Sequence, residues 1–249
     1  MTSFDDLPNA THDQWNGFVR HCFDFKGHHA WIVEPPVPAA EGCPWTWTMQ
    51  WADAFVDRTG VPDLLRRGYH HVTLEAFDTR CVDDSLQMFA DFQAYLVTNF
   101  GFAPKARLVG MSWGGFYSVR YATTFPQNVL KIYLDAPLLE LWHFYPDPHA
   151  TPTENAAQIG PWAQVPPAEG KEDDDPRMPV NRAAALAEAT IPVLLLYGVD
   201  DTVVIPKFNS VPFIDRFVRA GGDIMVVPRF QNHHPHGEAD ASRIVAFLA

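Results

Sequence analysis

The chain has 249 residues, of which 47% are hydrophobic and 19% are charged, and its formal net charge is -12 at pH 7. This apolar content is sufficient to bury a core, so the composition indicates a globular protein and excludes an intrinsically disordered one. The negative charge disfavours nucleic acid as a partner, and it disfavours binding to an anionic membrane surface. No apolar run approaches the roughly 18 residues that a membrane-spanning helix needs.

Two further features indicate the cellular compartment. The first six residues are acidic and are not followed by an apolar stretch, so they do not resemble a signal peptide. We therefore expect a cytoplasmic protein. The three cysteines, Cys22, Cys43 and Cys81, are scattered and form no CxxC pair, which indicates reduced thiols rather than a disulfide framework or a structural zinc site.

Strands and helices alternate along the chain. Apolar runs rich in β-branched and aromatic residues predict strands at 19–25, 29–34, 45–49, 71–76, 106–111, 129–134, 191–197 and 224–227. Helical spacing of apolar residues and terminal glycines predict helices at 62–68, 82–100, 115–125, 211–220 and 239–248. The later strands are apolar throughout, as is typical when helices cover both faces of a parallel sheet. We therefore predict one α/β domain, 1–249, with an open and mostly parallel sheet.

One segment, 137–180, interrupts this alternation after the sixth predicted strand. It contains nine prolines and an acidic run at 172–175. Segments of this length without regular structure are uncommon inside a compact domain and are usually functional. We interpret 137–180 as a lid-like insertion, with an ordinary surface excursion as the alternative, and the acidic run as a solvated patch.

The sequence Gly110-Met111-Ser112-Trp113-Gly114 matches the pattern G-x-S-x-G between a predicted strand and a predicted helix. In this setting the serine occupies a tight turn that exposes its hydroxyl, and small neighbours are needed because the backbone packs closely. We predict that Ser112 is a nucleophile and that the Trp113 amide, at a helix N-terminus, stabilises an oxyanion. The alternative is a glycine-rich turn with a buried serine.

A nucleophilic serine needs a base and an acid. The segment 232–237 carries three histidines after the last predicted strand, where the base lies in the chain order Ser, Asp, His. Asp200 and Asp201 follow the strand 191–197. All candidates thus follow carboxyl ends of strands, where open α/β sheets place their sites. The histidines also suggest surface polarity or a metal site, but neither carboxylates nor cysteines are interleaved with them, so we predict no metal.

Together these motifs resemble the α/β-hydrolase superfamily over nearly the whole chain. They are G-M-S-W-G-G at 110–115, G-x-x-D-x-x-V at 198–204 and H-H-P-H at 233–236. More narrowly, the chain is similar to a group of bacterial hydrolases with a G-M-S-x-G-G elbow, an I-Y-x-D-A-P strand end and a G-H-H-P-H loop. The corresponding strand end is 132–137 here, and the P-W-x-W segment of that group is similar to 44–47.

The resemblance implies an α/β-hydrolase fold and a triad of Ser112, Asp201 and His233. It selects Asp201, the last position of G-x-x-D, over Asp200. It leaves His236 as the second choice for the base and Asp135, at a strand end, as the alternative acid. It also implies that a second oxyanion donor follows the third strand, for which we expect an amide near Thr48.

Tryptophans cluster around the expected loops of the site. We interpret Trp45, Trp47 and Trp142 as walls of a substrate pocket, because aromatic rings line many small-molecule sites. The alternative for Trp45 and Trp47, and equally for Trp51 and Trp113, is ordinary core packing.

The predicted function is that of a serine hydrolase that cleaves a small-molecule carboxylic ester through an acyl-enzyme. It needs no cofactor and no metal. The alternatives are a peptidase or thioesterase with the same triad, and a hydrolase-fold protein that binds a small ligand without turnover. The sequence indicates no particular oligomeric state.

Overall fold

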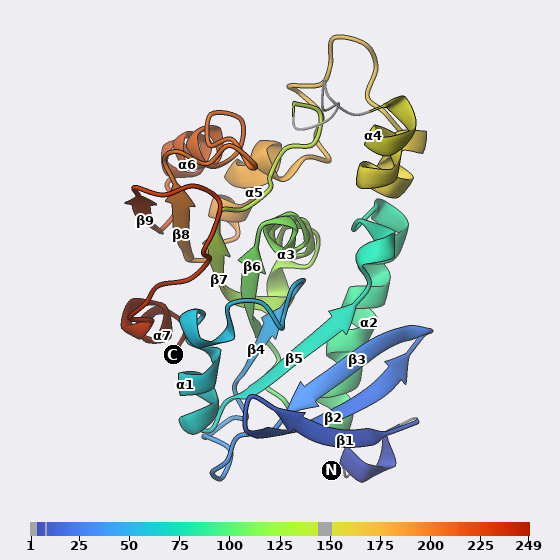
Figure 1. Ribbon diagram of the computed structural model, residues 1–249, viewed down its shortest axis with the longest axis vertical. Helices are drawn as coiled ribbons and strands as arrows, with labels where there is room; N and C mark the ends of the chain where they lie inside the picture. The colour runs from blue at the N-terminus through green and yellow to red at the C-terminus, as the bar shows by residue number, and fades with distance from the viewer. Residues whose placement is uncertain (1–3, 8, 144–150) are drawn as a thin grey trace.

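A single sheet forms the centre of the protein (Figure 1). The computed structural model describes residues 4–7, 9–143 and 151–249, and within these ranges nine strands belong to the sheet. The first three residues of the acidic N-terminal segment, and residues 144–150 of the predicted insertion, lie outside the described residues. Within the described residues, no helix is both long enough and apolar enough to cross a bilayer. Cys22, Cys43 and Cys81 are free thiols.

The strands follow the order β1-β2-β3-β5-β4-β6-β7-β8-β9 across the sheet. In chain order they are β1 (Thr11–Trp15), β2 (Phe18–Phe25), β3 (His28–Val33), β4 (Trp45–Thr48), β5 (His70–Glu75), β6 (Ala106–Met111), β7 (Val129–Asp135), β8 (Val193–Gly198) and β9 (Ile224–Arg229). The pairs β1–β2, β2–β3 and β3–β5 are antiparallel, and all other neighbours are parallel. The prediction of a mostly parallel sheet is confirmed.

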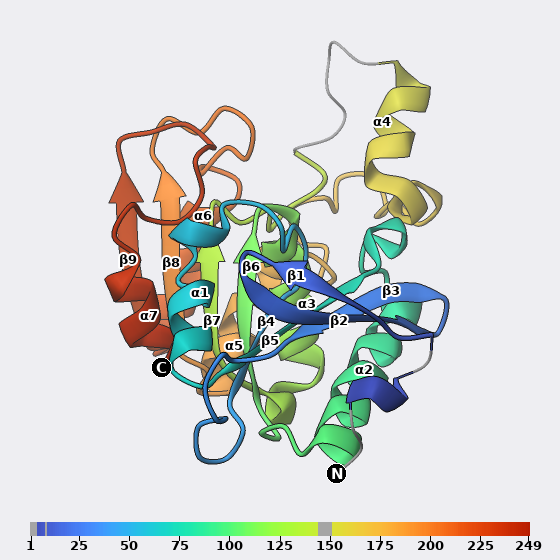
Figure 2. The same cartoon turned by 60° about the horizontal axis from the view of Figure 1, so that its bottom comes forward.

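Helices cover both faces of the sheet (Figure 2). They are α1 (Val61–Arg66), α2 (Asp83–Phe100), α3 (Trp113–Thr124), α4 (Pro152–Ile159), α5 (Ala183–Glu188), α6 (Ser210–Arg219) and α7 (Ser242–Leu248). Leu64 of α1 and Ile244 of α7 pack with Val109 of β6 on one face. The next strand residue, Leu108, points to the other face, where α2, α3, α5 and α6 contribute to the larger core cluster. This opposition follows from the alternation of side chains along a strand.

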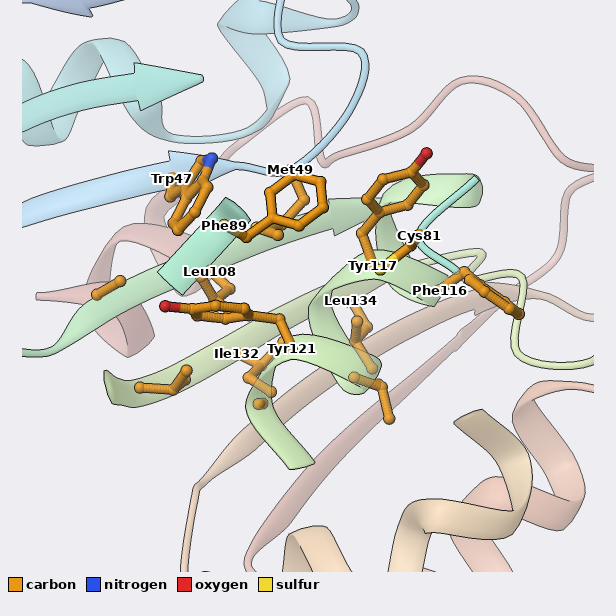
Figure 3. Packing of buried hydrophobic residues seen from close by; sticks show 14 of the residues in the cluster. Trp47, Met49, Cys81, Phe89, Leu108, Phe116, Tyr117, Tyr121, Ile132 and Leu134 are labelled. Carbon is orange, nitrogen blue, oxygen red and sulfur yellow. The ribbon is translucent and has the colours of Figure 1, made fainter. Parts of the chain in front are cut away.

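Two of the predicted pocket residues lie in this larger core. Trp45 and Trp47 are both 0% exposed, and their rings stack with centroids 5.9 Å apart. The ring of Trp47 also packs on Phe92 of α2 at 5.2 Å and on Tyr121 of α3 at 5.4 Å. Figure 3 shows Trp47 together with Tyr121 and with Phe89, another residue of α2. The interpretation of Trp45 and Trp47 as pocket walls is therefore wrong, because α2 and α3 cover the sheet face toward which both rings point.

The structure contains elements that the hydrophobic pattern did not predict. Strand β1 has four exposed residues among its five, so it lacks the apolar signal of a buried strand, and it places the insertion after the seventh strand instead of the sixth. Helix α4 lies inside the insertion and begins with a capping box, in which the side chain of Thr151 accepts from the Glu154 amide. The insertion is therefore partly helical, and its role as a lid stays a prediction.

The insertion packs on the side of α3. The indole of Trp162 is 1% exposed and donates a hydrogen bond of 2.8 Å to the carbonyl oxygen of Arg80. The guanidinium of Arg120, on α3, lies 4.6 Å from the centre of the Trp162 ring, which is the geometry of a cation–π contact. Trp162 therefore joins the insertion to the main body.

Replacing Trp47 should reveal its role in the core. We expect Trp47→Ala to lower the free energy of unfolding by about 3–5 kcal/mol, because it removes a large buried ring. Trp51→Ala is the matched control, since Trp51 is 43% exposed, and it should cost less than about 1 kcal/mol. Urea unfolding of both variants measures the difference. Equal effects would contradict the assignment of Trp47 to the core.

Candidate active site

Ser112 occupies a strained turn between β6 and α3. Its backbone has φ 50° and ψ -121°, a conformation that side chains rarely adopt. The turn is held by its own backbone groups. The Ser112 amide donates to the carbonyl oxygen of Asp135 at 3.0 Å, and the Ser112 carbonyl oxygen accepts from the amides of Gly115 and Leu138, each at 2.9 Å. The structure thus has a tight strand-to-helix turn at Ser112, as the sequence pattern predicted.

The glycines around Ser112 are required by close backbone approach. A Cβ on Gly110 would lie 2.8 Å from the carbonyl oxygen of Gly114, and one on Gly115 would lie 2.9 Å from Cα of Pro137. Both distances are below van der Waals contact, so any side chain would displace the turn. The sequence G-M-S-W-G-G therefore meets the steric requirements of the turn.

Ser112, His233 and Asp201 lie in a hydrogen-bonded row. The Nε2 atom of His233 is 3.2 Å from the Ser112 hydroxyl oxygen, and Nδ1 is 2.7 Å from Oδ2 of Asp201. The other carboxylate oxygen of Asp201 accepts from the amides of Val203 and Val204, each at 2.8 Å. Asp201 and His233 are each 4% exposed. Because the carboxylate accepts the proton of Nδ1, the second nitrogen of the ring is left to accept a proton from Ser112.

Asn232 joins the loops that carry the acid and the base. Its side-chain oxygen accepts from the amide of Thr202 at 3.0 Å and from the amide of His233 at 2.7 Å. The sequence analysis did not identify Asn232 as a residue of the site. Its only signal was that it replaces the glycine of the G-H-H-P-H loop.

The alternative residues form a second pair beside the first. Nδ1 of His236 is 3.0 Å from Oδ1 of Asp135, which is fully buried. The Asp135 carboxylate also accepts from the Gly237 amide at 2.8 Å and from Arg229 Nη2 at 2.5 Å. Asp200 is exposed. The histidine placed within hydrogen-bonding distance of Ser112 is therefore His233, while Asp135 and His236 are bonded to each other.

The charge of Asp135 is stabilised despite its burial. Burial alone would raise the pKa of Asp135, but the hydrogen bond with His236 and the positive charge of Arg229 outweigh that effect and hold the pKa below its ordinary value. The carboxylate is therefore ionised at neutral pH and compensates the mostly buried guanidinium of Arg229.

Three imidazole rings meet in the loop after β9. The ring centroids of His233, His234 and His236 lie 4.6–4.9 Å apart. One ligand atom of each ring lies within 4.8 Å of those of the other two. Burial, and then the neighbouring rings of His233 and His236, lower the pKa of His234. We name these residues the histidine cluster. Sequence spacing predicted no metal here because the carboxylates that approach the cluster come from distant segments.

The predicted oxyanion donors lie in different settings. The Trp113 amide is at the first residue of α3, next to Ser112. Thr48 lies within β4, where its carbonyl oxygen accepts from the Thr73 hydroxyl at 2.7 Å, and the following amide, of Met49, donates to Val109. The next amide along the chain is that of Gln50, which lies 3.5 Å from the position of a Cβ on Gly114. Gln50, two residues beyond the predicted Thr48, is therefore the residue of this loop whose amide faces the Ser112 turn.

A hollow of about 460 Å³ is connected to the Ser112 turn through Gln50 and Phe77, although no residue of the turn itself lines it. It is lined by residues 50–54 and by Thr73, Glu75 and Phe77. The ring of Phe77 packs on Trp51 at 4.7 Å and on Trp113 at 5.7 Å, which connects the hollow to the turn. The side-chain nitrogen of Gln50 is buried and has no hydrogen-bond partner among the described residues. Gln50 therefore lines the hollow and carries a buried donor that no described residue satisfies.

Trp142, the third predicted pocket residue, belongs to the insertion and is held by contacts with other residues of it. Its indole nitrogen donates to Oδ2 of Asp175 at 3.0 Å, and its ring lies 6.2 Å from that of Trp162. Trp142 is not among the residues that line the hollow at Gln50 and Phe77. The aromatic residues that do line this hollow are Trp51 and Phe77.

The buried charge of Asp135 makes the free energy of unfolding depend on pH. A carboxyl group whose pKa is lowered by folding stabilises the protein above its unfolded pKa, about 3.9, and the contribution is lost as pH falls through the folded value. At pH 7, Asp135→Asn should cost about 3–5 kcal/mol because Arg229 loses its charged partner. Urea unfolding from pH 7 to 3 should show this cost shrinking. The exposed pair of Arg219 and Asp215 provides the control Asp215→Asn, for which we expect less than about 1 kcal/mol at any pH.

Comparison with known proteins agrees with this architecture. A family model described as the α/β hydrolase fold matches residues 61–164. No match is found among curated protein sequences. The solved structure of Pyrococcus horikoshii acylaminoacyl peptidase superimposes with a TM-score of 0.65 and 11% identity over 98% of this chain and 40% of that chain.

Two Mycobacterium tuberculosis proteins are also similar in structure. A puromycin-hydrolyzing peptidase gives a TM-score of 0.63 and 19% identity over 97% of this chain and 38% of that chain. MPT51 gives a TM-score of 0.61 and 16% identity over 89% of this chain and 91% of that chain. The chain thus spans about two fifths of the length of the two peptidases. With the parallel sheet and the turn at Ser112, these likenesses show that the chain has the α/β-hydrolase fold, as its motifs predicted.

Proposed function

We propose that the protein is a serine hydrolase that cleaves a carboxylic ester of a small molecule. The observation that carries this proposal is the row of hydrogen bonds from Ser112 through His233 to Asp201. A fold by itself does not specify an activity, but a nucleophile, a base and an orienting carboxylate at hydrogen-bond distances are the parts that acyl transfer requires.

The proposed reaction proceeds in two stages. The Ser112 hydroxyl oxygen attacks the ester carbonyl carbon while its proton passes to Nε2 of His233. The imidazolium, stabilised by Asp201, then gives this proton to the leaving alcohol, and the acyl group remains on Ser112. A water molecule that loses its proton to the same nitrogen attacks the acyl-enzyme, which releases the acid and restores the serine.

We assign the oxyanion hole to the amides of Trp113 and Gln50. The Trp113 amide is at the positive end of α3, where it would stabilise the charge that develops on the carbonyl oxygen. The Gln50 loop faces the same turn across Gly114, which has no side chain to separate them. This assignment replaces Thr48, whose backbone belongs to the sheet.

The hollow connected to the turn supports a substrate with an apolar or aromatic group. Trp51 and Phe77 supply the ring surfaces of this hollow. Asp53 and Glu75 also line the hollow, and their negative charge would attract an ammonium group. This charge favours a second candidate, hydrolysis of an amide in a substrate that carries a free amino group, and two of the structurally similar proteins are peptidases.

Removing the nucleophile tests the proposal directly. Ser112→Ala should reduce turnover of nitrophenyl acetate by about 10⁴-fold or more, because the acyl-enzyme can no longer form. It should also abolish covalent labelling by a fluorophosphonate probe. Ser118→Ala, on the same helix, is the matched control and should keep both properties. Near-normal turnover by a folded Ser112→Ala protein would overturn the serine-hydrolase proposal and leave a ligand-binding role.

Paired variants test the acid and the base. Asp201→Asn should lower kcat by up to about 10⁴-fold, because the amide favours the wrong imidazole tautomer, whereas Asp200→Asn should have little effect. His233→Ala should match the loss in Ser112→Ala, since residues that act as a unit are not additive. His236→Gln should lose far less. For the wild type, kcat/KM should fall on acidification, because a protonated imidazole cannot accept the serine proton.

The opposite ranking in either pair would reassign the role concerned. If Asp200→Asn were the impaired variant, the acid would be Asp200. If His236→Gln were the impaired variant, His236 would be the base. A wild-type profile that is flat between pH 5 and 9 would exclude histidine as the base.

A matched substrate panel separates the ester and amide candidates. Nitrophenyl esters and nitroanilides of the same acyl group, each with and without an α-amino group, differ only in the bond cleaved or in the charge. We expect the esters to be hydrolysed and Trp51→Ala to raise KM with little change in kcat, because the ring contributes to binding before the reaction. Faster cleavage of the anilides with an amino group would instead establish the peptidase candidate.

A further inference from the structure

We propose that the histidine cluster binds a divalent transition-metal ion of the zinc type and that this binding reversibly inhibits the hydrolase. The site is inferred from the positions of His233, His234 and His236. Its inhibitory effect rests on the proposed function, in which His233 is the base.

The spacing of the rings suits a metal ion. Their ligand atoms lie within 4.8 Å of one another. Three imidazole nitrogens at about 2.0–2.1 Å from a tetrahedral zinc ion lie about 3.4 Å apart, so the ligand atoms need to approach by at most about 1.4 Å. His234 is exposed and can supply this movement by rotating its side chain, whereas His233 and His236 are 4% and 3% exposed.

The two buried rings are already oriented like metal ligands. Metal-bound histidines usually donate their other ring proton to a carboxylate, which fixes the ring and increases its basicity. Here Nδ1 of His233 is bonded to Asp201 at 2.7 Å and Nδ1 of His236 is bonded to Asp135 at 3.0 Å. Each ring is thereby left with Nε2 as its ligand atom. The structure thus brings together two carboxylate–histidine pairs and a third, accessible imidazole.

The neighbouring aromatic ring of Phe55 limits how the cluster can be arranged. It stacks on His234 with centroids 5.4 Å apart and meets His236 edge-on at 5.3 Å. These contacts place both imidazoles beside His233, and Phe55 itself supplies no ligand atom. The three ligands of the cluster are imidazole nitrogens, which favour zinc, cobalt, nickel or copper over magnesium or calcium.

The metal and the reaction would compete for the same lone pair. Nε2 of His233 lies 3.2 Å from the Ser112 hydroxyl oxygen, and in the proposed reaction this nitrogen accepts the serine proton. A metal ion bound at Nε2 occupies that lone pair and removes the base. The inhibition should therefore be complete at saturation and should be reversed by a chelator.

The experiment titrates Zn²⁺ into untagged protein that has been treated with EDTA and dialysed. Calorimetry measures Zn²⁺ binding, the visible absorption of added Co²⁺ reports its nitrogen coordination, and nitrophenyl acetate hydrolysis reports inhibition. We expect one ion per chain, inhibition with the same midpoint as binding, and recovery with EDTA. Mg²⁺ at the same concentration should have no effect.

His234→Gln is the decisive variant because His234 has no role in the proposed reaction. It should retain the basal activity, while its midpoints for Zn²⁺ binding and inhibition rise by about tenfold or more, a change typical of an altered metal environment. The matched control is His28→Gln, on β3, which should keep the wild-type midpoints. Circular dichroism checks that each variant is folded.

Several outcomes would overturn the proposal. An unchanged midpoint in His234→Gln would show that Zn²⁺ binds elsewhere, and activation by Zn²⁺ would contradict competition for the base. Ser112→Ala separates this proposal from the proposed function, because it lacks the nucleophile but keeps all three rings. It should bind Zn²⁺ at least as tightly as the wild type even if no ester is ever cleaved, and a failure to bind would exclude the site.

Discussion

The candidate site depends on Asp135, whose backbone and side chain hold different parts of it. Its carbonyl oxygen accepts from the amide of Ser112, which keeps the strained turn in place. Its carboxylate accepts from the Gly237 amide and is paired with His236 and Arg229, which fixes the loop that carries His233. A single buried residue at the end of β7 thus sets the distance between the candidate nucleophile and its base. The charge on that residue persists in the interior because Arg229 compensates it.

Local patterns after strands singled out Ser112, the adjacent Asp200 and Asp201, and the histidines of 233–236, and the resemblance to α/β hydrolases then selected Asp201 and His233. The roles of Asp135 and His236 were left open for a physical reason. A strand-end aspartate and a loop histidine look alike whether they bond to each other or to the nucleophile, and 101 residues of chain separate this pair. Only the packing of β7 against the loop after β9 decides which partners meet.

The wrong or missing predictions concern the burial of side chains and the strand at the edge of the sheet. In β4 the alternation of tryptophan and threonine correctly indicates that Trp45 and Trp47 share a face, but it does not reveal that α2 and α3 cover this face. The exposed strand β1 pairs only with β2, so backbone hydrogen bonds define it and no apolar pattern marks it. Whether a side chain lies in the core or lines a pocket depends on neighbours that are distant in the sequence, and so does whether a segment forms an edge strand or a loop. A hydrophobic pattern contains no information about these neighbours.

The hydrogen bond between Leu138 and Ser112 divides the insertion into a first part that is fixed to the Ser112 turn and a remainder whose sequence is freer to vary. The Leu138 amide donates to the Ser112 carbonyl oxygen, and Cβ of Pro137 lies against Gly115. The first residues after β7 therefore belong mechanically to the Ser112 turn, although the chain there already leaves the sheet. An engineer who exchanges this segment for that of another protein with this fold should keep residues 135–138 and graft beyond them. The distal portion can then change without rebuilding the Ser112 turn.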